Sequence, residues 1–303
     1  MIKGINYPWM DYGWDFGVPP GGWTGGQERE EFRASRRARI AADLRRLAGE
    51  GFSVVRWFIL ADGLGLPAQW GEEAIRPLVS DFGVLLEQCE QAGIQLLPSL
   101  LDFHWCLPAV AGGPGLLKGG RARLIRDADR RHHLLDRLLD PLLAVSWPRR
   151  DSLFAWEVMN EPEWVTRERT WRVWEGLFPG RRTVPVPAMQ AFLREAVQRI
   201  NAAGFVSTIG WAHWRTIRAW KTEDWGIGLQ QFHYYGQARK PLPLAATVCD
   251  GPCLVGEFAA APDPAWPGGA RSLEERLRRI EDAGYAGALV WSLNARDPFS
   301  RGG

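Results

Sequence analysis

Cysteine and lysine are scarce in this sequence, and long apolar runs are absent from it. Four cysteines in 303 residues are too few for a disulfide framework, and they lack the paired C-x-x-C spacing of a zinc site. No stretch approaches the roughly 18 consecutive apolar residues of a membrane span. Lysine occurs only four times and the formal net charge is +2, so no strongly basic balance points to nucleic acid. The composition therefore predicts neither a membrane partner nor a nucleic-acid partner.

Metal-binding and export motifs are missing as well. Neither an HExxH nor an H-x-H ligand pattern occurs, so we expect no metal and no cofactor. The first six residues do not lead from a basic segment into an apolar one. We therefore expect a cytoplasmic protein if this N-terminus is native, and a secreted protein if a signal peptide has been removed. Cys249 and Cys253 either close a small disulfide loop or remain reduced thiols beside a turn.

Eight short apolar segments alternate with helical patterns along the chain. Most are near-continuous apolar runs, as expected for parallel strands that are buried on both faces. We predict strands over Lys3–Tyr7, Ser53–Ile59, Ile94–Leu101, Leu153–Met159, Phe205–Ile209, Leu229–His233, Cys253–Phe258 and Ala288–Ser292. No linker divides the chain, so residues 1–303 are predicted to form one α/β domain, a (β/α)8 TIM barrel.

The predicted helices lie between these strands and share one kind of ending. Their ranges are Glu28–Glu50, Asp81–Ala92, Ala128–Val145, Ala188–Ala203 and Leu273–Ala283. At four points a glycine follows the helical pattern and leads into a strand: Gly51, Gly93, Gly204 and Gly284. Glycine accepts the left-handed geometry that ends a helix. Ser272 and Glu275 have the spacing of a capping box at the start of the last helix.

The end of the chain leaves no room for a normal eighth helix. Only residues 293–303 follow the last predicted strand, and they include Pro298 and two terminal glycines. We expect the eighth helix to be short or missing. Ala288 and Val290 should then form an exposed apolar strip that a loop or a second subunit covers, which suggests a homodimer.

Tryptophan is unusually frequent. The chain has 17 tryptophans, more than a core needs, and several follow predicted strands. We expect many of them to lie on a surface that binds something flat and partly apolar. The tryptophans at or just past the carboxyl ends of strands are Trp9, Trp57, Trp105, Trp164, Trp211 and Trp291, whereas Trp147 and Trp156 are expected in the core.

Two glutamates stand out by their placement. Glu161 directly follows the fourth predicted strand, and Glu257 lies near the end of the seventh. Strands four and seven lie three apart in an eight-stranded ring, so the two side chains can face each other across its mouth. Hydrolysis of a glycosidic bond needs such a pair, with one acid to protonate the leaving oxygen and one carboxylate to attack or to activate water.

Asn160-Glu161-Pro162, with Glu257 at the end of a later strand, resembles the retaining glycoside hydrolases of clan A, and family 5 (cellulases and β-mannanases) in particular. Further positions of that family fall in order on the predicted strands, and these are Arg56, His104, His233, Tyr235 and Trp291. The likeness covers nearly the whole chain. It departs from the family at Val-Gly-Glu-Phe around Glu257, which lacks a second acidic residue, and at the missing last helix.

The resemblance implies a role for each of these residues. Glu161 would be the acid/base and Glu257 the nucleophile, with Arg56 and Tyr235 hydrogen-bonded to Glu257 so that it stays ionised. Asn160 would contact the sugar 2-hydroxyl. His104 and His233 would shape the cleavage subsite, and Trp291 would form its floor.

The resulting hypothesis is a retaining hydrolase of β-1,4-linked mannan, glucan or their oligosaccharides. The alternatives are an exo-acting β-glycosidase on short oligosaccharides and a non-catalytic carbohydrate-binding barrel. Glu157 shares strand parity with Glu161, and we expect it to be a buried partner of an arginine. Glu163 is the fallback acid and is otherwise expected at a subsite or at the rim.

Overall fold

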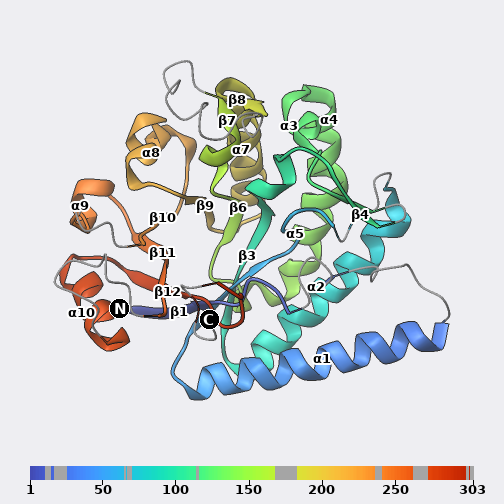
Figure 1. The fold of residues 1–303 in the computed structure, drawn as a ribbon, viewed down its shortest axis with the longest axis horizontal. Helices are drawn as coiled ribbons and strands as arrows, with labels where there is room; N and C mark the ends of the chain where they lie inside the picture. Colours follow the sequence, from blue (N-terminus) through green and yellow to red (C-terminus); the bar gives the residue numbers. More distant parts are fainter. Residues whose placement is uncertain are drawn as a thin grey trace.

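The computed structural model describes residues 1–10, 15–16, 26–64, 66, 70–113, 116–167, 183–235, 241–261, 272–297 and 300. Eight parallel strands close into a barrel in the order β1-β12-β11-β10-β9-β6-β3-β2 (Figure 1). Their bounds are β1 Ile2–Asn6, β2 Val54–Phe58, β3 Gln95–Asp102, β6 Trp156–Asn160, β9 Ser207–Trp211, β10 Gln230–His233, β11 Cys253–Ala259 and β12 Gly287–Trp291. All eight predicted strands are confirmed, and the predicted (β/α)8 barrel is the observed fold.

Helices surround this barrel (Figure 1). They are α1 Gly26–Gly49, α2 Glu72–Ala92, α3 Ala122–Arg126, α4 Ala128–Leu134, α5 Asp140–Ser146, α7 Val186–Ala202, α8 Trp214–Ala219, α9 Ala245–Val248 and α10 Leu273–Asp282. A π-helical turn, Leu135–Leu139, joins α4 to α5, and 3₁₀ turns cover Phe103–Cys106, Trp147–Ser152, Pro162–Val165 and Thr222–Trp225. Short two-stranded sheets pair β4 Val110–Gly113 with β5 Leu116–Lys118, and β7 Thr166–Arg167 with β8 Val184–Pro185. Within the described residues, no helix has both the length and the apolar character to cross a membrane.

The helix ends follow the sequence patterns. All four glycines that were predicted to end helices have positive φ, between 67° and 85°. Ser272 Oγ accepts a hydrogen bond from the Glu275 amide at 3.2 Å, as the capping box requires. The start of α2 was predicted wrongly at Asp81, because the helix begins at Glu72 and runs through Pro77. Burial of Ala74, Ile75 and other residues of these first turns outweighs the backbone hydrogen bond that proline removes.

The side chains in the barrel interior form layers, which are apolar toward the amino ends of the strands and polar toward their carboxyl ends. The lower layer takes one apolar residue from each of six strands or their approaches: Val54, Leu97, Ala155, Leu229, Leu254 and Leu289. Two residues further along β2, β6 and β10 come Arg56, Glu157 and Gln231. A polar layer therefore rests on an apolar plug at the carboxyl ends of the strands, where barrel active sites are built.

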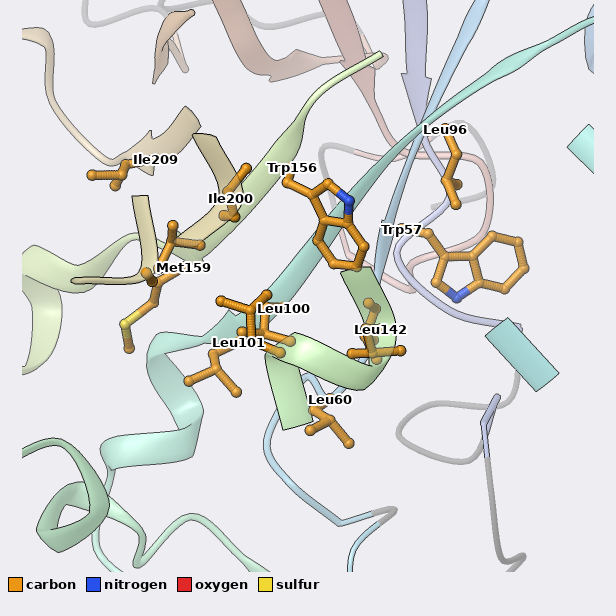
Figure 2. Packing of buried hydrophobic residues seen from close by; sticks show 14 of the residues in the cluster. Trp57, Leu60, Leu96, Leu100, Leu101, Leu142, Trp156, Met159, Ile200 and Ile209 are labelled. Carbon is orange, nitrogen blue, oxygen red and sulfur yellow. The ribbon is translucent and has the colours of Figure 1, made fainter. Parts of the chain in front are cut away.

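The outer faces of the strands pack against the helices. Leu142 of α5, Trp156 of β6 and Leu100 of β3 belong to one cluster of buried apolar residues, part of which Figure 2 shows. These three side chains are fully or almost fully buried. Trp156 is therefore a core residue, as predicted. Trp147, which was also expected in the core, is 50% exposed.

The barrel closes at β12 without the exposed strip that was predicted there. No helix follows β12 within the described part of the chain, which ends at residue 300. Ala288 and Val290 nevertheless have no exposed surface, and they belong to the same apolar cluster as Leu44 of α1 and Ile280 of α10. Both side chains are small enough for this cluster to enclose them. The expected strip is absent at these two residues, so the argument for a homodimer through it fails.

Candidate active site

Arg56 lies at the centre of the polar layer, and its side chain is completely buried. Its Nε and Nη2 donate to the two carboxylate oxygens of Glu157 at 2.6 and 2.7 Å. Its Nη1 donates to Glu257 Oε1 at 2.6 Å and to Asn6 Oδ1 at 2.8 Å, and its Nη2 also donates to Asn160 Oδ1 at 2.7 Å. The guanidinium thus holds groups from β1, β6 and β11 in fixed positions. Glu157 is an arginine partner, as the sequence predicted.

Two glycines leave room for this network. A Cβ on Gly210 would lie 2.8 Å from Glu157 Oε1, and a Cβ on Gly256 would lie 2.3 Å from Gln231 Oε1. Any larger residue would displace the network. Gln231 Nε2 and Ser99 Oγ each donate to Glu157 at 2.7 Å, which completes the set of donors around this carboxylate.

Replacing Glu157 with glutamine should destabilise the protein strongly. The variant keeps the shape of the side chain but leaves the buried Arg56 charge without its bidentate partner, and loss of one member of a buried ion pair costs about 3–5 kcal/mol. Urea unfolding measures this loss. The matched control is Glu72→Gln, in an exposed pair with Arg76 at 3.0 Å, where we expect about 1 kcal/mol or less. Equal losses in the two variants would contradict the assignment of Glu157 as the main counter-ion.

Glu257 has a hydrogen-bond donor on each carboxylate oxygen. Arg56 occupies Oε1, and the Tyr235 hydroxyl donates to Oε2 at 2.6 Å. The side chain is only 5% exposed. Burial raises the pKa of Glu257, whereas the Arg56 charge and the Tyr235 hydrogen bond oppose that rise. The two expected donors are thus in place, but they do not hold this pKa below its ordinary value. The burial and the Glu257 charge also raise the pKa of Tyr235, so its hydroxyl keeps its proton.

Glu161 lies in a different environment. Its backbone has φ 47° and ψ 51°, a left-handed conformation that costs a non-glycine residue about 1–3 kcal/mol and is typical of functional sites. Its carboxylate accepts a hydrogen bond from Trp164 Nε1 at 3.0 Å, and no hydrogen bond links it to an arginine or lysine among the described residues. Burial, together with the negative charge of Asp102, raises the pKa of Glu161 to about 8. Glu161 therefore carries a proton at neutral pH.

His233 links the two glutamates. Its Nδ1 lies 2.7 Å from Glu161 Oε1 and 3.5 Å from Glu257 Oε2. Burial lowers the pKa of His233 to about 4, so the ring is neutral at pH 7. One oxygen of Glu161 and one of Glu257 lie within 4.8 Å of each other. Of the two carboxyl groups, only Glu257 is bonded to a cation, so the first proton that the pair binds goes to Glu161.

Glu161, His233 and Glu257 could also offer three ligand atoms to a metal ion, and they are the one such group found within the described parts of the chain. A divalent cation there would lie beside the Arg56 guanidinium, which is already bonded to Glu257. The charge of Arg56 disfavours a metal at this position.

Sequence reasoning missed two residues of this site, Asp102 and Asn6. Asp102, at the end of β3, accepts a hydrogen bond from Asn160 Nδ2 at 2.6 Å and contacts His104 Nδ1. Asn6, at the end of β1, donates to the Gly256 carbonyl at 3.0 Å and accepts from Arg56. Each is a polar residue at the carboxyl end of an apolar strand. This position, at the end of the barrel where the site lies, is the sequence signal that could have identified them.

Of the six tryptophans predicted at strand ends, Trp9, Trp164 and Trp291 keep exposed surface, whereas Trp57, Trp105 and Trp211 are buried. Trp9 and Trp291 form an aromatic group with Phe58, with ring centroids 6.1–6.3 Å apart. Trp164 is 37% exposed next to Glu161. Trp105 and Trp211 have no exposed surface, so their predicted role at a sugar subsite is wrong.

Packing explains both corrections. Trp105 lies under the guanidinium of Arg121, whose carbon is 4.8 Å from the ring centroid. Trp211 packs edge-on against Trp220 and Trp225 at 5.3 and 6.4 Å. Both indoles therefore belong to the core beneath the loops rather than to the barrel mouth.

Glu163, the fallback acid, is bonded to backbone amides of a neighbouring loop. Its carboxylate accepts hydrogen bonds from the amides of Ala212 and His213 at 3.1 and 3.3 Å. Burial raises its pKa to about 7. Glu163 fastens the loop after β6 to the loop after β9.

The four cysteines are free thiols, including Cys249 and Cys253, whose pairing the sequence left open.

No protein-family model matches this chain, and no curated protein sequence matches it. Solved structures do resemble it. An endo-1,4-β-mannanase from Eisenia fetida superposes with a TM-score of 0.74 at 20% identity over 99% of this chain and 86% of that chain. A β-1,4-mannanase from the sea hare Aplysia kurodai superposes with a TM-score of 0.71 at 22% identity, over 100% of this chain and 90% of that chain. An exo-β-1,4-mannosidase from an Opitutaceae bacterium superposes with a TM-score of 0.60 at 18% identity, over 97% of this chain and 52% of that chain. The chain thus has the (β/α)8 fold of these β-mannan-active glycosidases.

Proposed function

We propose that this protein is a retaining β-glycoside hydrolase that cleaves β-1,4-linked mannan, glucan or their oligosaccharides. The observation that carries the proposal is the pair Glu161 and Glu257, with oxygens within 4.8 Å of each other at the barrel mouth. Retaining enzymes have carboxyl groups about 5–5.5 Å apart, whereas inverting enzymes need about 6.5–9.5 Å to admit a water molecule. The observed separation favours direct attack by one carboxylate.

The unequal partners of the two glutamates support a role for each. Glu257, held by Arg56 and Tyr235, attacks the anomeric carbon while Glu161 gives its proton to the leaving oxygen. The glycosyl ester on Glu257 is then hydrolysed: Glu161 takes a proton from water, the water oxygen bonds to the anomeric carbon, and Glu257 leaves as a carboxylate. The pKa of about 8 for Glu161 suits a group that starts as an acid.

The remaining residues would bind and orient the sugar. Asn160 is oriented by Arg56 and Asp102 and keeps one amide N–H for the 2-hydroxyl. His104 and His233 would form the walls of the subsite, with Trp291 and Trp9 as its apolar floor. Trp164, exposed beside Glu161, would stack on the leaving-group sugar.

The choice of β-1,4-mannan as the first substrate rests on the structural neighbours, two of which are β-1,4-mannanases. An exo-acting enzyme on short oligosaccharides is the second candidate, since one neighbour is an exo-β-1,4-mannosidase. Purified protein incubated with mannan, glucan and manno-oligosaccharides, followed by product sizing, distinguishes the two. Mixed oligosaccharides indicate endo action, whereas release of mannose alone indicates exo action. No turnover of these or of any aryl β-glycoside would leave a carbohydrate-binding barrel and refute the proposed activity.

A further inference from the structure

Asp102 is a buried carboxylate with no place in the proposed chemistry. It lies at the end of β3 and is only 6% exposed. One oxygen, Oδ2, accepts from Asn160 Nδ2 at 2.6 Å. The other, Oδ1, accepts from the His104 backbone amide at 2.8 Å and contacts His104 Nδ1. Asp102 therefore touches two proposed sugar-binding residues at once.

These contacts fix the orientation of the Asn160 amide. An arginine can only donate hydrogen bonds and a carboxylate can only accept them. Asn160 must therefore present its oxygen to Arg56 and its nitrogen to Asp102, as it does. Loss of the Asp102 charge would remove one of the two hydrogen-bond constraints on the orientation of the Asn160 amide, and only the one from Arg56 would remain. On the other side, Asp102 fixes the ring of His104, whose pKa the Asp102 charge and hydrogen bond raise against the effect of burial.

We propose that Asp102 is a positioning residue of the active site, which orients Asn160 and His104 toward the sugar and places a negative charge at the strand end beside Glu161. This inference rests on the proposed glycosidase function. Asp102 acts through its neighbours and forms no bond with the reacting atoms.

The charge effect depends on the ionisable groups around Glu161. Among the described residues these include Asp102 and His104 at the end of β3, Arg56 from β2, His233 and Tyr235 from the end of β10, Glu257 from β11, and Glu163 on the same loop as Glu161. Asp102 raises the pKa of Glu161, while Arg56 and His104 lower it. Neutralising Asp102 should therefore lower the pKa of Glu161, and removing His104 should raise it.

The test is Asp102→Asn, with kcat/KM measured against pH on an unactivated β-glycoside and on an aryl β-glycoside with a good leaving group. For the parent enzyme we expect the alkaline limb on the unactivated substrate near pH 8, where Glu161 loses its proton. In Asp102→Asn this limb should move to lower pH. Activity at the optimum should fall about 10- to 100-fold on both substrates, because Asn160 is less well oriented.

Asp81→Asn is the matched control. Asp81 is similarly buried, at 8% exposure, but its carboxylate bonds to Arg33 of α1. We expect its alkaline limb to stay at the parent value. If Asp102→Asn does not fold, His104→Gln carries the test, because His104 lowers the pKa of Glu161 and its removal should move the limb to higher pH.

The outcomes separate this inference from the proposed function. A parent enzyme that turns over no β-glycoside refutes the function, whatever the variants do. An active parent with an unmoved alkaline limb in Asp102→Asn, or a limb that moves to lower pH in His104→Gln, overturns the role of Asp102 alone.

Discussion

Replacing Glu257 with alanine is expected to abolish turnover of every glycoside substrate, with a loss of about 10⁴-fold or more in kcat. The reason is that the variant lacks the carboxylate that is bonded to Arg56 and Tyr235 and that we propose as the nucleophile. Initial rates on an aryl β-glycoside measure the loss.

Azide supplies the internal control for this variant. The missing side chain leaves space for a small anion, which should restore turnover of an activated substrate and form the α-glycosyl azide. Recovered turnover also shows that the variant is folded. A β-glycosyl azide would instead identify Glu257 as the acid/base, and undiminished turnover without azide would exclude it from the chemistry.

Replacing Glu161 with alanine should produce a loss that depends on the leaving group. For unactivated glycosides, which need a proton on the departing oxygen, we expect a loss of about 10²–10⁴-fold. A dinitrophenyl leaving group needs little protonation, so formation of the glycosyl ester should be almost unaffected. The alkaline limb near pH 8 should disappear, because the group that titrates there is gone.

Glu163→Ala is the matched comparison for Glu161, because Glu163 is the neighbouring carboxylate with a raised pKa. Its loss should loosen the loop at Ala212 and His213 and lower the activity on both substrate types by a similar factor. A leaving-group-dependent loss in Glu163→Ala, together with a uniform loss in Glu161→Ala, would exchange the two roles.

The barrel itself could be predicted from the sequence because its signals are local. Buried parallel strands are continuous apolar runs, and each helix ended by Gly51, Gly93, Gly204 or Gly284 needs a left-handed residue at that point. The start of α2 was missed because burial of its first turns compensates for Pro77, and such packing is not a local property. The small size of α8 and α9 was likewise not visible in the residue pattern.

The polar layer could be predicted where strand parity determines it. Glu157 was predicted as the buried partner of an arginine from its strand parity, but that arginine was identified as Arg56 only by the structure. Asp102 and Asn6 were missed because an isolated Asp or Asn at the end of a strand is common, and only the Arg56 network gives these two a function.

The tryptophans show where the reasoning failed. A position at the end of a strand places a residue near the barrel mouth but does not determine the direction of its side chain. Trp164 points outward, whereas Trp105 turns under Arg121 and Trp211 packs on Trp220. Neither partner could be identified from sequence spacing.

The most direct test of double displacement at Glu257 and Glu161 is the configuration of the first product. Proton NMR during hydrolysis of a β-glycoside, recorded before the sugar mutarotates, distinguishes the two anomers. Attack by Glu257 followed by attack of water predicts that the β anomer forms first and the α anomer grows in later. Initial release of the α anomer would mean a single displacement by water and would contradict the account.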